Sequence, residues 1–168
     1  MLVRFRATIS LVIIGLVISG ATAFPLLHEL NILSGWITDG SGDFNLQHHT
    51  GLEHWILRVR EGLEVTYQNY PFVAYGTDWL AFGHIIIALF FILPWMEPVQ
   101  YRGVLYVGVV SCVLVIPLAL ICGPIRGIPF YWRLIDCSFG VLCVVPLLYA
   151  VWLSKRLERE QPSRRNNL

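Results

Sequence analysis

The sequence predicts an all-α integral membrane protein, a bundle of four transmembrane helices with one extracytoplasmic amphipathic helix. Hydrophobic residues make up 56% of the 168 residues and charged residues only 14%, whereas a soluble domain carries roughly 25% charged residues. Four stretches are long and apolar enough to cross the hydrocarbon core, which requires about 20 residues in a helix. The formal net charge of +1 provides no overall field for attracting nucleic acid. Composition therefore excludes a disordered chain, a nucleic-acid binder and an ordinary cytosolic enzyme.

The four apolar stretches are predicted to be helices, because in lipid every backbone N–H and C=O must be paired within its own segment. The first and third contain no charged residue, whereas Asp78 and Asp136 lie near the starts of the second and fourth. Together they form a predicted membrane domain over residues 1–153, with spans at about 7–27, 76–95, 104–122 and 134–153.

The first span also has features of a secretory signal peptide. Arg4 and Arg6 precede an apolar run, and Ala21-Thr22-Ala23 matches a small-residue cleavage site. The apolar run nevertheless continues to Leu27, which is long enough to span. Small residues recur every four positions, as in closely packed membrane helices: Gly15, Ser19 and Ala23. We expect an uncleaved helix, with cleavage as the alternative.

The distribution of charge predicts that both termini are cytoplasmic. The segment 154–168 carries five basic and two acidic residues, whereas the loop 28–75 carries two basic and six acidic residues. Because cytoplasmic segments of membrane proteins are enriched in Lys and Arg, the segment 154–168 is predicted to be a basic cytoplasmic tail. Its polar end, 161–168, is expected to lack regular structure.

The outer loop 28–75 divides into two parts. Residues 34–49 are rich in Gly, Asp and Ser and predict irregular structure. Residues 51–69 predict an amphipathic helix that caps the bundle or lies on the membrane surface. Its end is predicted at Tyr70-Pro71, because the residue before proline disfavours helix. The apolar face of this helix comprises Leu52, Trp55, Ile56, Val59, Leu63 and Tyr67.

Five ionisable residues are predicted to gather at the outer end of the bundle. Asp78 and His84 belong to the second span, Arg126 and Arg133 to the loop before the fourth, and Asp136 to the fourth. Ionisable groups at membrane depth are costly and therefore indicate paired or functional sites. One interpretation is a set of structural pairs that fix the loops. The other is an outward-facing cavity for a small ligand, a lipid head group or a proton.

Histidines in the outer loop raise the question of a metal or haem site. Their spacing beside Glu53 matches no metal-binding motif, so we expect solvated polar residues and no metal. A haem held by His28 and His84 is disfavoured, because the two residues are expected to differ in depth. We therefore predict no cofactor. The clustered histidines are His48, His49 and His54.

The four cysteines form no C-x-x-C motif, which argues against a thiol-redox enzyme. Cys122 and Cys137 flank an outer loop, and a disulfide between them is one alternative in an oxidising compartment. The other is that all four remain free and pack as small apolar residues: Cys112, Cys122, Cys137 and Cys143.

Three segments resemble a group of uncharacterised bacterial four-span inner-membrane proteins. They are SGATAFP at 19–25, YPFVAYGTDWLAFGH at 70–84 and GPIRGIPFYWRLIDC at 123–137. The resemblance implies a multi-pass protein of the bacterial inner membrane and places Ala21-Thr22-Ala23 within a transmembrane helix. It implies no activity.

Lipoprotein signal peptidases also have four spans and an outer pair of aspartates, which Asp78 and Asp136 resemble. The chain lacks the Asn-x-x-Asp-Arg and Phe-Asn-x-Ala-Asp stretches of that family. Arg126 and Arg133 would also keep both aspartates ionised, which opposes the shared proton of an aspartyl dyad. We therefore expect a different function.

The predicted function is a non-catalytic scaffold or binding subunit, whose outer cluster fixes the loops and holds a membrane-protein partner or small ligand. The lipid bilayer is its expected surrounding. The alternative is a membrane-embedded enzyme or proton-coupled component that uses Asp78, His84 and Asp136.

Overall fold

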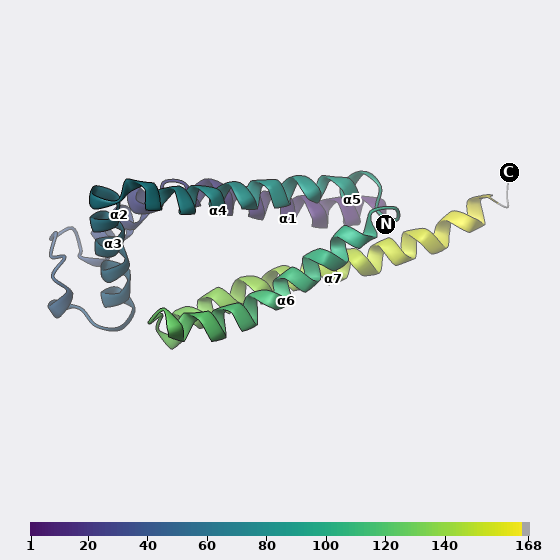
Figure 1. The fold of residues 1–168 in the computed structure, drawn as a ribbon. Helices are drawn as coiled ribbons and strands as arrows, with labels where there is room; N and C mark the ends of the chain where they lie inside the picture. The colour runs from purple at the N-terminus through teal and green to yellow at the C-terminus, as the bar shows by residue number, and fades with distance from the viewer. Residues whose placement is uncertain (166–168) are drawn as a thin grey trace. The chain divides into compact units, whose positions relative to one another are not determined.

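The computed structural model confirms an all-helical fold. It describes residues 1–165, with side chains described through residue 160, and no strand occurs among them. Four helices are long and apolar enough to cross a membrane. The elements are α1 (Leu2–Ala23), α2 (Leu26–Ile37), η1 (Leu46–His48), α3 (Gly51–Asn69), α4 (Pro71–Phe90), α5 (Ile92–Met96), α6 (Arg102–Ile125) and α7 (Phe130–Arg165) (Figure 1).

The chain forms two compact units that divide α1 and α4 between them. The first unit contains Met1–Leu16 and the chain from Ile86 onward, and the second contains Val17–Ile85. The prediction of one membrane domain over residues 1–153 stays a prediction.

The first apolar stretch ends earlier than predicted. The sequence predicts a span to about Leu27, but α1 ends at Ala23 and α2 begins at Leu26. The break falls at Phe24-Pro25, where proline restricts the preceding residue and lacks an N–H donor. A separate helix, which the sequence does not predict, therefore follows the first span.

The prediction of irregular structure from residue 34 was wrong for its first residues, because α2 continues to Ile37. Its C-terminus has a Schellman motif, in which the Gly40 N–H donates to the Gly35 carbonyl at 2.9 Å and the Asp39 N–H to the Trp36 carbonyl at 3.3 Å. Asp39 and Gly40 both have positive φ, 48° and 71°. These bonds satisfy carbonyls at the end of α2 and turn the chain into the loop.

The predicted amphipathic helix is confirmed as α3 over the same residues. Tyr70 separates α3 from α4, and Pro71 is the first residue of α4. Proline suits that position, because an N–H there has no partner within the helix. The second span consequently begins five residues before the predicted residue 76.

The loop between α6 and α7 is shorter than predicted. Gly123, Pro124 and Ile125 belong to α6 rather than to the loop. The Ile128 N–H donates to the Gly123 carbonyl at 2.9 Å, and the Gly127 N–H donates to the Pro124 carbonyl at 3.1 Å. This second Schellman motif has glycine in the left-handed position, with φ of 70°. The motif reverses the chain directly into α7.

The tail prediction requires a correction for residues 161–165. These residues were expected to lack regular structure, but α7 continues as a helix through Arg165. Residues 166–168 of the predicted tail lie outside the described residues. Between Pro146 and Pro162 no proline removes a hydrogen bond from the helix. Lys, Arg, Glu and Leu, which are good helix formers, fill positions 155–160 and carry the helix into this segment.

In the first unit, α6 and α7 form an antiparallel hairpin (Figure 1). Glycines permit their close approach. A Cβ atom on Gly140 would collide with the backbone carbonyl oxygen of Cys112, and one on Gly108 of α6 would lie 3.2 Å from Leu147 Cδ1 of α7. Residues from the start of α1 complete the core, which comprises Phe5, Ile9, Val12, Phe91, Leu105, Leu147, Ala150, Val151 and Leu153.

In the second unit, α2 packs against α3. Arg60 on α3 connects three segments, because its Nε donates to Asn31 Oδ1 at 2.6 Å and its guanidinium lies 4.3 Å from the Phe44 ring centre. The end of α1 contacts α4 at a glycine, where a Cβ atom on Gly20 would lie 2.7 Å from the Ala81 carbonyl oxygen.

Apolar side chains cover much of the outer surface of the four long helices. Leu11, Ile121 and Leu142 are 65%, 63% and 68% exposed. Burying apolar surface provides the main favourable term in folding, and these faces find no such burial within their unit. They are suited to apolar surroundings such as lipid.

Substitution of Gly140 tests the contact between α6 and α7. We expect Gly140→Ala to lower the free energy of unfolding by about 2 kcal/mol, a typical cost of overpacking, because the new methyl group would meet backbone that cannot rotate away. Thermal unfolding in detergent, followed by circular dichroism, measures the change. The control is Gly103→Ala on α6, where a Cβ atom would meet nothing within 4 Å. Equal stability of the two variants would contradict the close contact.

Candidate functional site

The predicted outer cluster is divided between the two units. Asp78 and His84 lie on α4 in the second unit. Arg126 follows α6, and Arg133 and Asp136 lie in the first two turns of α7, all in the first unit. The five-residue cluster therefore stays a prediction.

His84 is held by its own helix. Its Nδ1 lies 2.8 Å from the Leu80 carbonyl oxygen, and because a carbonyl only accepts, Nδ1 carries the proton of this hydrogen bond. In the neutral ring, Nε2 is then an acceptor. The backbone of Gly20 on α1 lies beside this histidine, since a Cβ atom there would be 3.2 Å from His84 Cβ. The helix thus fixes the ring and its tautomer.

Arg133 and Asp136 share the start of α7 without forming an ion pair. The Arg133 side chain packs against Gly123, and its guanidinium carbon lies 5.1 Å from the Phe130 ring centre. Its Nε is buried and has no hydrogen-bond partner among the described residues. Asp136 is half-buried. In the part of its unit that the structure describes, no side chain pairs with this carboxylate.

Three histidines hold together the segment that connects α2 to α3. His48 Nδ1 lies 2.7 Å from Asp43 Oδ2, and His49 Nδ1 lies 3.3 Å from Glu53 Oε2. His49 Nε2 also lies 3.0 Å from the Asp43 carbonyl oxygen, and His54 Nδ1 lies 2.9 Å from that of residue 46. Among residues with described side chains, no group of three or more His, Cys, Asp or Glu is arranged to hold a metal ion.

These contacts shift two pKa values in opposite directions. Hydrogen bonding to the Asp43 carbonyl, followed by that to the Glu53 carboxylate, raises the pKa of His49 above its usual 6.5. Hydrogen bonding to His48, followed by that to the Asn45 N–H, lowers the pKa of Asp43 below its usual 3.8. The folded loop therefore favours a protonated His49 and an ionised Asp43.

Arg102 connects the beginning of α6 to α7 through a network that the sequence does not reveal. Its Nε donates to Ser154 Oγ at 2.8 Å, and its Nη2 donates to Glu158 Oε2 at 2.9 Å. The Ser154 hydroxyl is fully buried and donates to the Pro98 carbonyl at 2.7 Å. The contacts join positions more than 50 residues apart, so no local pattern identifies them.

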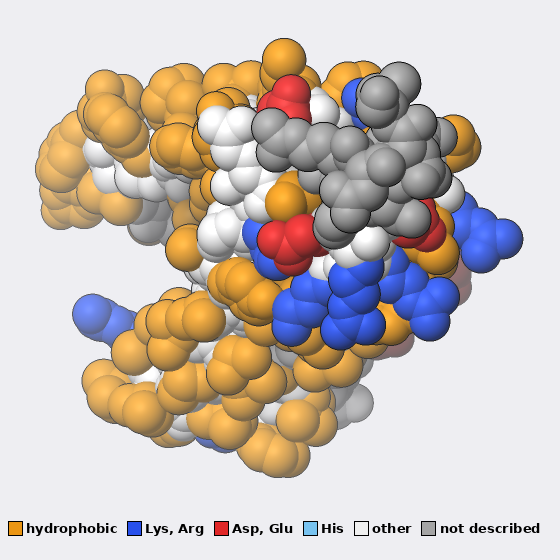
Figure 2. Space-filling model, turned by 90° about the vertical axis from the view of Figure 1, so that its right-hand side faces the viewer, with side chains coloured by type: hydrophobic (Ala, Val, Ile, Leu, Met, Phe, Trp, Pro, Cys, Tyr) orange, Lys and Arg blue, Asp and Glu red, His pale blue; other side chains and the backbone are white. Residues whose placement is uncertain are grey.

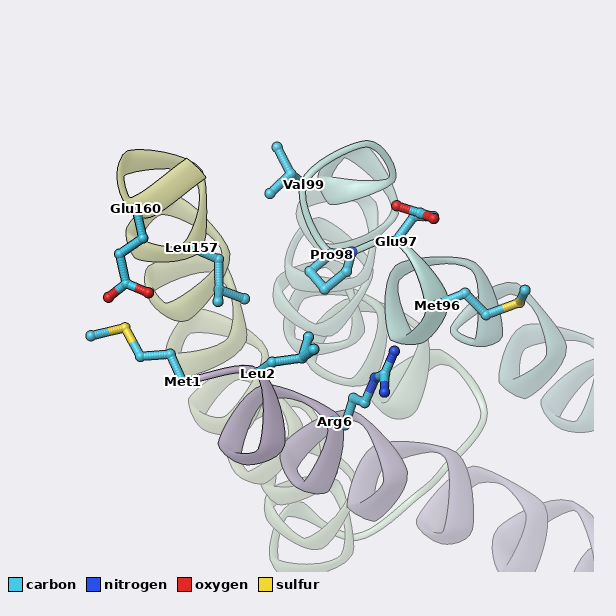
Figure 3. A pocket seen from close by; sticks show the side chains of 9 residues that line it. All are labelled: Met1, Leu2, Arg6, Met96, Glu97, Pro98, Val99, Leu157 and Glu160. Atoms are coloured by element: carbon cyan, nitrogen blue, oxygen red, sulfur yellow. The ribbon is translucent and has the colours of Figure 1, made fainter. Parts of the chain in front are cut away.

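A cavity of about 470 Å³ lies in the first unit beside the N-terminus (Figure 3). Arg6, Glu97 and Glu160 bring charge to an otherwise largely apolar lining. Arg6 is already engaged, because its Nε donates to the Trp95 carbonyl at 3.3 Å and its guanidinium lies 4.8 Å from the Trp95 ring centre. The remaining lining residues are Met1, Leu2, Met96, Pro98, Val99 and Leu157.

All four cysteines have free thiols in the structure. The structure therefore has no disulfide between Cys122 and Cys137, and it agrees with the alternative in which all four cysteines remain unbridged.

The fold and its helices define a helical protein with four candidate membrane spans. Searches found no match to a family model, to a curated protein or to a solved structure.

The two shifted pKa values predict pH-dependent order in the segment between α2 and α3. The contribution of His49 is complete below pH 6.5 and is lost as pH rises through its raised pKa. The contribution of Asp43 is complete above pH 3.8 and is lost as pH falls through its lowered pKa. Hydrogen exchange at the Asn45 and Gln47 amides, corrected for intrinsic rates, should show greatest protection between these values. His49→Gln should remove the decline at high pH, and an unchanged decline would contradict this assignment.

Removing the Ser154 hydroxyl should destabilise the first unit. We expect Ser154→Ala to cost about 2 kcal/mol in the free energy of unfolding, because the buried Pro98 carbonyl loses its donor and Arg102 loses an acceptor. The matched control is Ser111→Ala, because the exposed Ser111 hydroxyl bonds only to the Val107 carbonyl of its own helix. Chemical denaturation in detergent measures both changes, and a loss as large for Ser111→Ala would contradict the proposed importance of the network.

Proposed function

We propose that the chain is a multi-pass protein of the bacterial inner membrane with both termini in the cytoplasm. The four long apolar helices and their exposed apolar side chains support insertion. The excess of basic residues in segment 154–168 and of acidic residues in loop 28–75 supports the orientation. In this orientation the start of α7 lies at the outer side of the membrane.

We further propose that the protein is a non-catalytic scaffold or binding subunit that recognises a membrane-protein partner or small ligand at this outer end. One observation carries the proposal. None of the four charged residues of the predicted cluster forms an ion pair within the described part of its own unit: Asp78, Arg126, Arg133 and Asp136. Elsewhere, Arg60 and Arg102 do pair with carboxylates.

Unpaired charges at the edge of an apolar helix favour recognition of another group. A charged side chain near hydrocarbon is costly unless something pairs with it. A partner or ligand that supplies a carboxylate to Arg133, or a donor to Asp136, would lower that cost when it binds. Arg133 is already oriented by Gly123 and the Phe130 ring, so little side-chain entropy remains to be lost on binding.

Quantitative co-purification from native membranes tests this proposal. Tagged full-length protein is extracted with its surrounding membrane, and retained proteins and small molecules are measured by mass spectrometry. Arg133→Gln and Asp136→Asn should each reduce a specific retained species at least about tenfold, the effect expected for losing a charged hydrogen bond. The control Arg58→Gln removes an exposed charge from α3. Equal retention by all variants at equal abundance would contradict the proposal.

The alternative is an enzyme or proton-coupled component that uses Asp78, His84 and Asp136. The two proposals differ in their response to a neutral isostere. Asp136→Asn preserves shape but cannot exchange a proton, so a proton-coupled protein would lose proton movement in reconstituted vesicles while retaining its partner. A binding subunit would instead lose or weaken retention of its partner.

A further inference from the structure

The C-terminal half of α7 has two chemically different faces. At about 100° per residue, its outward face contains Tyr149, Trp152, Lys155, Arg156 and Arg159, and all five side chains are exposed. We call these five residues the α7 basic face. The opposite side of the same turns is buried within the first unit and includes Ala150, Leu153 and Ser154.

Aromatic rings and cations are ordered against one another on the α7 basic face. The Tyr149 and Trp152 rings stack with centroids 5.7 Å apart and an interplanar angle of 19°. The Arg156 guanidinium carbon lies 4.0 Å from the Trp152 ring centre, and Lys155 Nζ lies 5.9 Å from that of Tyr106 on α6. These contacts restrain the cations, and both side chains remain exposed.

The three cations are not neutralised within their unit. Lys155, Arg156 and Arg159 form no ion pair with any residue whose side chain is described. The nearby carboxylates do not pair with these cations. Glu158 pairs with Arg102 at 2.9 Å, and Glu160 lines the cavity beside the N-terminus (Figure 3). Lys and Arg side chains gather on the side of the molecule that carries this end of α7 (Figure 2).

The length of α7 would place the α7 basic face in the head-group region of a bilayer. From Phe130 to Leu153 the helix rises about 35 Å at 1.5 Å per residue, somewhat more than the roughly 30 Å hydrocarbon core. Trp152 and Tyr149 then lie at the inner interface, where such rings are enriched. The three cations follow directly, at the level of the lipid phosphates.

We propose that the α7 basic face binds the phosphate groups of anionic phospholipids in the inner leaflet. The arginines donate to phosphate oxygens, Lys155 adds a point charge, and the stacked rings pack against the glycerol and upper acyl region. This inference rests on the proposed membrane insertion and orientation. It adds a specific lipid contact at the end opposite the proposed outer recognition site.

Electron spin resonance of reconstituted full-length protein tests the inference. The protein is placed in phosphatidylcholine bilayers with spin-labelled phosphatidylglycerol or phosphatidylcholine, and the motionally restricted fraction of each lipid is compared. We expect wild-type protein to prefer phosphatidylglycerol. The triple variant Lys155→Gln, Arg156→Gln, Arg159→Gln should reduce that preference at least about fivefold, the effect of losing one basic contact with an anionic surface.

Two controls separate the α7 basic face from charge in general. Arg58→Gln removes an exposed cation on α3 and should leave the preference unchanged. The charge-preserving variant Lys155→Arg, Arg156→Lys should retain it. An unchanged preference in the triple variant would overturn the inference. The inference would also fail if wild-type protein lost its preference for phosphatidylglycerol when millimolar inorganic phosphate is added at constant ionic strength, because that result would indicate a site for free phosphate.

Extraction with alkaline carbonate distinguishes the two levels of the proposal. Wild-type protein that is released from the membrane contradicts the proposed insertion, and the lipid contact with it. Wild-type protein that stays inserted but shows no preference for phosphatidylglycerol overturns the α7 basic face alone.

Discussion

The close approach of α6 and α7 is the contact on which the first unit depends. Gly140 brings the two backbones together beside the Cys112 carbonyl, which a side chain at this position would prevent. At the start of α6, Arg102, Ser154 and Pro98 are joined by hydrogen bonds around a buried hydroxyl. In apolar surroundings, close backbone packing and hydrogen bonds replace the hydrophobic effect as the forces that hold helices together.

The rest of the first unit follows from this hairpin. Its paired helices provide the surface on which the start of α1 packs, through Phe5, Ile9 and Val12. Burial of one side of α7 also determines which side faces outward, so the positions of Trp152 and Arg156 depend on packing at Leu153 and Ala150. The cations of α7 are therefore displayed together because the opposite face is committed to the core.

Sequence reasoning was strongest where composition and local stereochemistry determine structure. Apolar length alone identified four spans, and periodicity together with Tyr70-Pro71 gave both ends of α3. The helix α2 was missed because its first residues, Leu26 and Leu27, extend the apolar run of the first span. Its other residues begin with the polar His28 and Glu29 and were therefore assigned to the loop. The helical part of the tail was missed because its polar composition was weighted above its helix-forming residues.

Long-range contacts were beyond sequence reasoning. Nothing near Arg102 in the sequence points to Ser154, which lies 52 residues away, and the cavity beside the N-terminus requires three separate segments. The predicted outer cluster shows the same limit, because charge and depth can be read from a sequence while helix adjacency cannot. The structure adds that Arg133 is oriented by Phe130 and that Asp136 has no ion-pair partner within the described part of its unit.

Both functional proposals depend on which side of the membrane each loop faces, and cysteine accessibility measures this directly. In a variant without the four native cysteines, Ser41→Cys reports on the outer loop and Gln100→Cys on the turn before α6; both positions are exposed. A membrane-impermeant maleimide should label the cysteine at position 41 in intact spheroplasts, and the cysteine at position 100 only after permeabilisation. Labelling of position 100 but not position 41 in intact spheroplasts would contradict the account.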